Sequence, residues 1–146
     1  MKRLLTIIAV ASLALVAGSC AVPDEDYVHD DATISAIYIS TTQKDATGKE
    51  KNITFAGVVT NGEDGEMGEV LFTIPKEKRK QIDLDAVKIR ANVGFDAYVK
   101  VTKEGGKDVD RTLYGIHDIT EGIYLTVTAK MTGRTKDYHL AATIKK

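Results

Sequence analysis

The sequence contains no tryptophan and only one cysteine among its 146 residues. A lone cysteine has no partner for a disulfide within the chain. After Cys20 the chain holds only two serines, Ser35 and Ser40, and no second thiol. Because a nucleophilic hydrolase needs a serine or cysteine activated by a neighbouring base, we expect no serine triad.

Histidine is also scarce, with His29, His117 and His139 as its only occurrences. These three are far apart in sequence and match no zinc spacing. His117 is followed by Asp118, but neighbours in an extended segment point to opposite sides, so the pair is not a dyad by spacing. We therefore predict that the protein is not an enzyme and carries no cofactor.

Neither sign of charge is in large excess. The full chain has 20 basic and 21 acidic residues, and removing residues 1–19 would leave 18 basic residues against the same 21 acids. The shorter chain then has a net charge of about −3. Proteins that bind nucleic acid present basic surfaces, so we predict no nucleic-acid partner.

Residues 1–19 have the layout of a secretory signal peptide. A positive flank, Met1–Arg3, precedes the mostly apolar stretch Leu4–Val16, and three small residues follow at 17–19. The flank stays in the cytoplasm, the apolar stretch enters the bilayer, and the small residues let a peptidase close on the backbone. The chain is therefore predicted to be exported.

The motif AGSC at positions 17–20 resembles the lipobox of bacterial lipoproteins. In that motif the cysteine thiol is acylated before cleavage, so the resemblance implies that Cys20 becomes the first residue and carries acyl chains such as palmitate. Two acyl chains suffice for stable anchoring to a membrane. Ala17 stands where the motif usually has leucine, which leaves open a plain secreted protein cleaved after Ser19 or Ala21. A retained transmembrane anchor also stays open, because the uncharged stretch 4–23 has about the ~20 residues of a spanning helix.

Three acids, Asp24, Glu25 and Asp26, follow closely after Cys20. An acidic cluster at this place resembles the surface-export signal of Bacteroidetes lipoproteins, and a solvated tether is the equally weighted alternative. We predict a lipidated cysteine and acidic linker over 20–32 and a single domain over 33–146. The predicted location is the cell envelope, with the chain anchored by its lipid to the outer membrane and exposed at the surface if the acidic cluster is an export signal.

Alternation of apolar and polar residues is the main signal of the domain, and it predicts strands with one buried face. The segment 75–84 has a charged run and no apolar stripe, so it is predicted as a charged loop. About seven strands with regular turns predict an all-β, immunoglobulin-like (Greek-key) β-sandwich. The predicted strands are 34–39, 53–59, 70–74, 87–93, 95–102, 123–130 and 138–144.

The end of the chain resembles immunoglobulin-like domains of Bacteroidetes cell-surface lipoproteins. The resemblance is carried by YGI at 114–116, DIT at 118–120, IYLTVTA at 123–129 and TGRTKDY at 132–138. In those domains a hairpin with "VTA", a turn and a tyrosine closes the sandwich. The resemblance implies a fold and a location, since many such domains have no assigned activity.

The segment 61–69, NGEDGEMGE, gathers four acids and three glycines. Glycines let the chain curl and carboxylates suit a hard cation, so a calcium site at Glu63, Asp64, Glu66 and Glu69 is one hypothesis. The oxygen spacing does not match an EF-hand loop, and a mobile hairpin tip often has this composition. We therefore predict no metal.

Three tyrosines are candidates for ligand binding. Alternation places Tyr98 and Tyr124 on the outward sides of their strands, and Tyr114 lies in a loop. Sugars stack on exposed aromatic rings, and lipidated sandwiches often belong to glycan-capture systems. The chain lacks tryptophan, however, and outward tyrosines are common in strands for structural reasons alone.

The hypothesis is therefore a non-catalytic, lipid-anchored envelope binding protein whose partner is a polysaccharide. The alternative is a structural or protein-interaction subunit of an envelope or surface assembly, which would use a sheet edge or the acidic loop to contact another envelope protein.

Overall fold

The computed structural model describes residues 28–146. The predicted signal peptide, Cys20 and most of the predicted linker lie outside the described residues. The described elements are β1 (Ile34–Lys44), β2 (Glu50–Ala56), β3 (Val58–Thr60), β4 (Gly68–Ile74), the 3-10 helix η1 (Lys76–Gln81), β5 (Lys88–Val93), β6 (Ala97–Glu104), β7 (Lys107–Thr112), β8 (Ile123–Ala129) and β9 (Thr135–Ile144).

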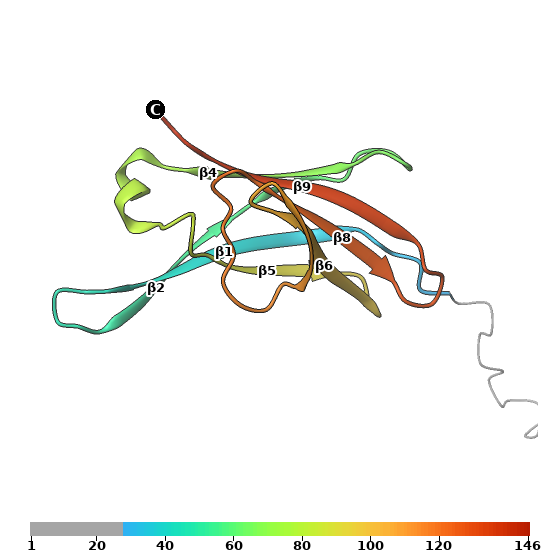
Figure 1. The fold of residues 1–146 in the computed structure, drawn as a ribbon, viewed down its shortest axis with the longest axis horizontal. Coiled ribbons are helices and arrows are strands. Elements are labelled where there is room, and N and C mark those ends of the chain that lie inside the picture. The colour runs from blue at the N-terminus through green and yellow to red at the C-terminus, as the bar shows by residue number, and fades with distance from the viewer. Residues whose placement is uncertain (1–27) are drawn as a thin grey trace, which may run out of the picture.

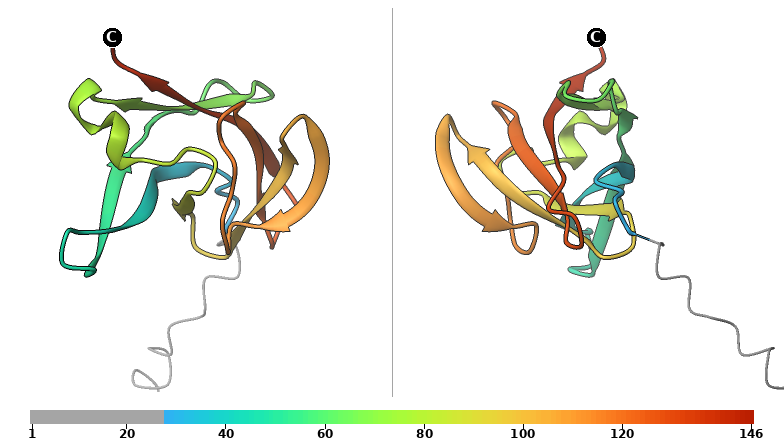
Figure 2. Two further views of the ribbon diagram at one scale, coloured as in Figure 1. Left: turned by 60° about the vertical axis from the view of Figure 1, so that its left-hand side comes forward. Right: turned by 90° about the vertical axis from the view of Figure 1, so that its right-hand side faces the viewer.

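The strands form two layers, as Figures 1 and 2 show. The smaller sheet has the order β2-β1-β5 and the larger sheet the order β3-β4-β9-β8-β6-β7. Neighbouring strands run antiparallel except β4 and β9, which pair in parallel from Gly68 opposite Tyr138 to Ile74 opposite Ile144. The predicted all-β sandwich is confirmed, with nine strands over the described residues in place of about seven. Its division into three and six strands differs from the four and three of a constant-type immunoglobulin domain.

Inward-facing residues of both sheets build one core. Successive residues of a strand point to opposite faces, so the alternate apolar residues face inward. Each large apolar side chain contributes about 1.5–3 kcal/mol when it is fully buried. Side chains exposed by no more than 1% include Ile34, Ile37, Ile39, Val70, Phe72, Ile74, Val87, Val101, Ile119, Ile123, Leu125, Val127, Tyr138 and Leu140.

Tyr138 on β9 joins three parts of the chain. Its hydroxyl accepts a hydrogen bond from the Ile34 amide at 3.0 Å and donates one to Asn61 Oδ1 at 2.5 Å. Burial raises the pKa of Tyr138, so the hydroxyl keeps the proton that it donates. Gly68 lies directly opposite on β4, where a Cβ atom would overlap the tyrosine ring. The position therefore needs glycine for packing.

The sequence pattern missed β3 and β7, each for a local reason. The predicted strand 53–59 is broken at Gly57, whose amide bonds to the Ile37 carbonyl and where a Cβ would lie 2.9 Å from the Phe72 ring. The chain crosses there from the smaller to the larger sheet. β7 is an edge strand with Val109 as its one apolar residue, so it shows no alternation.

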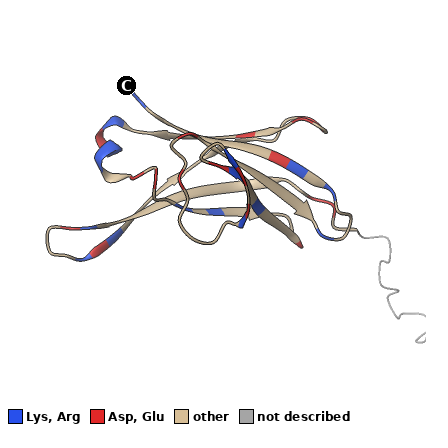
Figure 3. Ribbon diagram, viewed as in Figure 1, with Lys and Arg blue, Asp and Glu red and all other residues tan. Residues whose placement is uncertain are grey.

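The segment 75–84, predicted as a charged loop, contains the six-residue helix η1. None of its residues is buried, and this helix, with its lysines and arginine coloured blue in Figure 3, lies at the same end of the molecule as the C-terminus. The described chain begins at the opposite end (Figure 1). Ala32 is only 4% exposed there, so packing extends into the segment predicted as a linker. No helix within 28–146 combines the length and apolar character needed to cross a bilayer.

Candidate functional site

The structure does not bring the three predicted tyrosines together. Tyr98 and Tyr124 point outward from the larger sheet, with Tyr98 40% exposed and Tyr124 half-buried. Tyr98 lies opposite Thr128 of β8, so about 13 Å of strand separates it from Tyr124. Tyr114 is 92% exposed in the loop between β7 and β8. The three rings do not make one platform.

Two of these rings are partly covered by neighbouring side chains. The His139 ring lies 4.8 Å from the Tyr124 ring, and Lys103 Nζ lies 5.6 Å from the centroid of the same ring. Lys130 Nζ stands 6.0 Å from the Tyr98 ring centroid. Part of each ring surface is therefore used within the protein.

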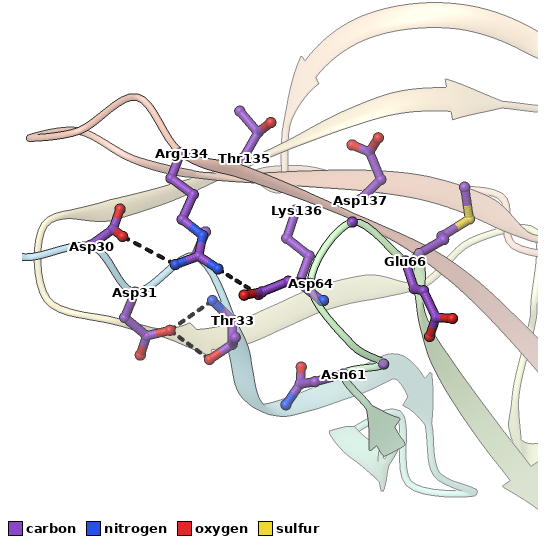
Figure 4. Close-up of a pocket in the computed structure, with 14 residues that line it drawn as sticks. Asp30, Asp31, Thr33, Asn61, Asp64, Glu66, Arg134, Thr135, Lys136 and Asp137 are labelled. Atoms are coloured by element: carbon purple, nitrogen blue, oxygen red, sulfur yellow. Dashed lines mark hydrogen bonds and ion pairs between the residues drawn. The ribbon is translucent and has the colours of Figure 1, made fainter.

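The acidic loop between β3 and β4 borders a cleft of about 350 Å³ at the end where the described chain begins (Figure 4). Asp64 accepts a hydrogen bond from Arg134 at 2.5 Å, and Glu66 accepts one from the Glu63 amide at 3.2 Å. Over residues 28–146, no three histidine, cysteine or acidic side chains gather as a metal-binding group. The acids of the calcium hypothesis are dispersed, and Asp64 is neutralised by an arginine.

Arg134 also holds the first described residues. It donates to Asp30 at 3.1 Å, and the Thr132 hydroxyl donates to the same carboxylate. These bonds, that of Thr132 first, lower the pKa of Asp30. The cleft is thus lined by internal ion pairs, and exposed pairs of this kind contribute little to stability.

The two adjacent residues considered for catalysis, His117 and Asp118, have separate hydrogen-bond partners. His117 is 1% exposed, with Nδ1 3.3 Å from Glu104 Oε2 and Nε2 3.3 Å from the Leu113 carbonyl. Asp118 accepts hydrogen bonds from the hydroxyl and amide of Thr120, which lower the pKa of Asp118. The two side chains therefore bond to different partners.

A hollow on the outer face of the smaller sheet was missed by the sequence reasoning. The strand register puts Tyr38 opposite Arg90 and Ser40 opposite Lys88, while Ser40 also faces Thr54 of β2. The hollow has a volume of about 330 Å³, and we call it the β1 groove. Its lining residues are Tyr38, Ser40, Asn52, Thr54, Lys88, Ile89 and Arg90.

The β1 groove combines an aromatic ring, neutral hydrogen-bonding groups and two cations. The Arg90 guanidinium carbon lies 5.4 Å from the centroid of the Tyr38 ring, a cation–π arrangement. Asn52 Oδ1 accepts a bond of 2.8 Å from Thr42, which leaves its NH₂ group as a donor. The Arg90 contact covers part of the half-buried Tyr38 ring, as the lysines do for Tyr98 and Tyr124. A polar ligand would contact the rest of the ring and be oriented by hydrogen bonds to the neighbouring groups.

One sequence signal points to this site. Tyr38 stands between Ile37 and Ile39, which are both buried, so alternation places its ring on the outer face. The residues of β2 and β5 that lie beside Tyr38 follow only from the strand register, which the sequence does not show.

Comparison with known proteins does not show a family. No protein-family model matches the chain, and no curated protein matches it. Among solved structures, a crystal structure from Bacteroides fragilis described as a "putative secreted protein" is similar at 22% identity and a TM-score of 0.49, covering 82% of this chain and 100% of that one. A likeness of this size does not place the two chains in one family.

Proposed function

We propose that the protein is a non-catalytic, lipid-anchored binding protein of the cell envelope and that its ligand is a glycan. The AGSC motif supports anchoring through Cys20. The observation that carries the binding part is the β1 groove, where Tyr38 stands beside Ser40, Thr54 and the Asn52 amide.

A groove of this kind suits a sugar chain for two reasons. Aromatic rings offer a flat apolar surface for the C–H face of a sugar, and a few hydroxyl and amide groups bond its hydroxyls. The groove also lies on an open sheet face, across β2, β1 and β5, so a polymer can lie over it without entering a closed cavity.

Truncating Tyr38 tests this site. We expect Tyr38→Ala to weaken binding of the recognised glycan about tenfold, because the loss of ring contact is worth roughly 1 kcal/mol or more. Tyr38→Phe keeps the ring and most of the affinity. The measurement is a polysaccharide array, followed by isothermal titration, with the mature chain carrying Cys20→Ser so that it bears no lipid.

Three other tyrosines serve as matched controls. Tyr98→Ala, Tyr114→Ala and Tyr124→Ala should bind as the unaltered chain does, with folding of every variant checked by circular dichroism. Loss of binding in Tyr98→Ala or Tyr124→Ala, with normal binding by Tyr38→Ala, would move the site to the larger sheet. A folded chain that binds no glycan would refute the proposed ligand.

A free sheet edge favours the second function, a protein-interaction subunit. Among the strands described in 28–146, β5 pairs only with β1, and the Val87 amide and carbonyl both bond to His117 on the other side. Backbone groups of alternate residues, Ile89 and Ala91, therefore face the same open side. A neighbouring hollow of about 370 Å³, lined partly by Leu113 and Tyr114, would receive side chains of an added strand.

A further inference from the structure

We infer that the glycan bound in the β1 groove is anionic and that Lys88 and Arg90 recognise its carboxylate or sulfate groups. This inference rests on the proposed glycan-binding function and names the class of its ligand.

The first argument is local charge. Lys88 and Arg90 are two residues apart on one face of β5, so their Cα atoms are about 7 Å apart. The groove lining contains no aspartate or glutamate. This region is therefore positive in a chain whose acids and bases nearly balance. Like charges at this spacing repel each other, and a bound anion removes that repulsion.

The second argument is that Lys88 and Arg90, like most lysines and arginines of residues 28–146 but unlike those in ion pairs, have no carboxylate partner. Arg134 is paired with Asp30 and Asp64, and Lys100 pairs with Asp110 at 2.8 Å. Within residues 28–146, no ion pair joins a carboxylate to Lys88 or Arg90. These two cations are available to a ligand without first breaking an internal pair.

The third argument is the position of Arg90 beside the ring. Its guanidinium carbon lies 5.4 Å from the centroid of the Tyr38 ring, and a guanidinium carries its N–H donors in a planar fork. That fork matches the two oxygens of a carboxylate or sulfate. Lys88 stands in the neighbouring cross-strand row with Ser40 and Thr54. Each cation thus has a neutral group beside it, so charge and sugar hydroxyls can be bound together.

The experiment compares glycans that differ only in charge. The mature Cys20→Ser chain is titrated with polygalacturonate and its methyl ester, with alginate and its propylene glycol ester, and with dextran sulfate and dextran. We expect the recognised acidic polymer to bind about tenfold more tightly than its neutralised form, with affinity falling as NaCl is raised.

Variants locate the effect. Lys88→Gln and Arg90→Gln should each weaken binding of the acidic polymer about tenfold, and Arg90→Lys should restore only part of it because lysine lacks the fork. Lys103→Gln is the matched control, since Lys103 also stands over a tyrosine ring, on the larger sheet. Lys103→Gln should bind the acidic polymer normally, and thermal unfolding would check that all four variants are folded.

The outcomes separate this inference from the proposed function. Equal binding of acidic and neutral forms, unaffected by Lys88→Gln and Arg90→Gln, would overturn the anionic ligand and leave glycan binding intact. If Lys103→Gln weakens binding of the acidic polymer equally, the effect is one of general charge, and the assignment of the site to Lys88 and Arg90 would be overturned. If phosphatidylglycerol vesicles or a single-stranded oligonucleotide bind as tightly as the polymer, the claim that the anionic ligand is a glycan would be overturned. A folded chain that binds none of the glycans would refute both proposals.

Discussion

Tyr138→Ala is expected to lower the free energy of unfolding by about 4 to 5 kcal/mol. Removing a fully buried aromatic ring costs roughly 3–5 kcal/mol, and here two hydrogen bonds are lost as well. The ring is 0% exposed, and its hydroxyl joins Ile34 and Asn61. Because domains have stabilities of about 5–15 kcal/mol, the variant should be marginally folded, as urea unfolding would show.

Tyr138→Phe separates the hydroxyl from the ring. It keeps the packing against Gly68 but leaves the Ile34 amide and the Asn61 side chain without this partner, at a cost of about 1–3 kcal/mol. Tyr114→Ala, at a 92% exposed position, should change stability by less than about 0.5 kcal/mol. A Tyr138→Phe variant as stable as the unaltered chain would show that the hydroxyl does not hold the start of β1.

Glu104→Ala is the second change with a large expected effect, about 2–4 kcal/mol of unfolding free energy. Its carboxylate is 11% exposed and accepts bonds from Arg111 at 2.7 Å and from the Asp118 amide at 2.8 Å, with His117 Nδ1 at 3.3 Å. Arg111 is half-exposed, so its ion pair contributes little. The cost comes from leaving the Asp118 amide without its acceptor and His117 Nδ1 without its carboxylate partner in a buried setting.

The effect of Glu104→Ala should be local as well as global. We expect hydrogen exchange to speed up first at His117, whose amide bonds to the Val87 carbonyl at 2.8 Å. Asp110→Ala, which removes an exposed pair with Lys100, is the matched control and should cost at most about 1 kcal/mol. Equal destabilisation by the two variants would contradict a structural role for the buried network.

Much of the fold follows from alternation. Seven predicted strands correspond to seven observed ones, because each turns alternate apolar side chains toward the core, although those of β2 are only half-buried. β7 is not predicted because both of its faces are largely exposed to water. β3 is not predicted as a separate strand because the break between β2 and β3 depends on Gly57 lying against Phe72. The parallel pairing of β4 with β9 joins residues 70 positions apart, from Gly68 with Tyr138 onward, and no local pattern encodes it.

The candidate site was harder to predict than the fold. Alternation correctly turns Tyr98 and Tyr124 outward, but it does not reveal their separation along the larger sheet. Tyr38 follows the same alternation. What makes it a candidate binding residue is its contact with Arg90, 52 positions away, which only the β1–β5 register brings beside it. Alternation describes one strand at a time, whereas the groove is formed by three strands.

The most direct test of a binding face on the smaller sheet is an NMR titration of the mature chain with a short oligosaccharide of the recognised glycan. The β1 groove predicts that amide shifts cluster on β1, β2 and β5 around Tyr38, Thr54 and Arg90, and that β6 and β8 stay unchanged. Shifts that centre instead on Tyr98 and Tyr124, or on the acidic loop, would contradict the assignment.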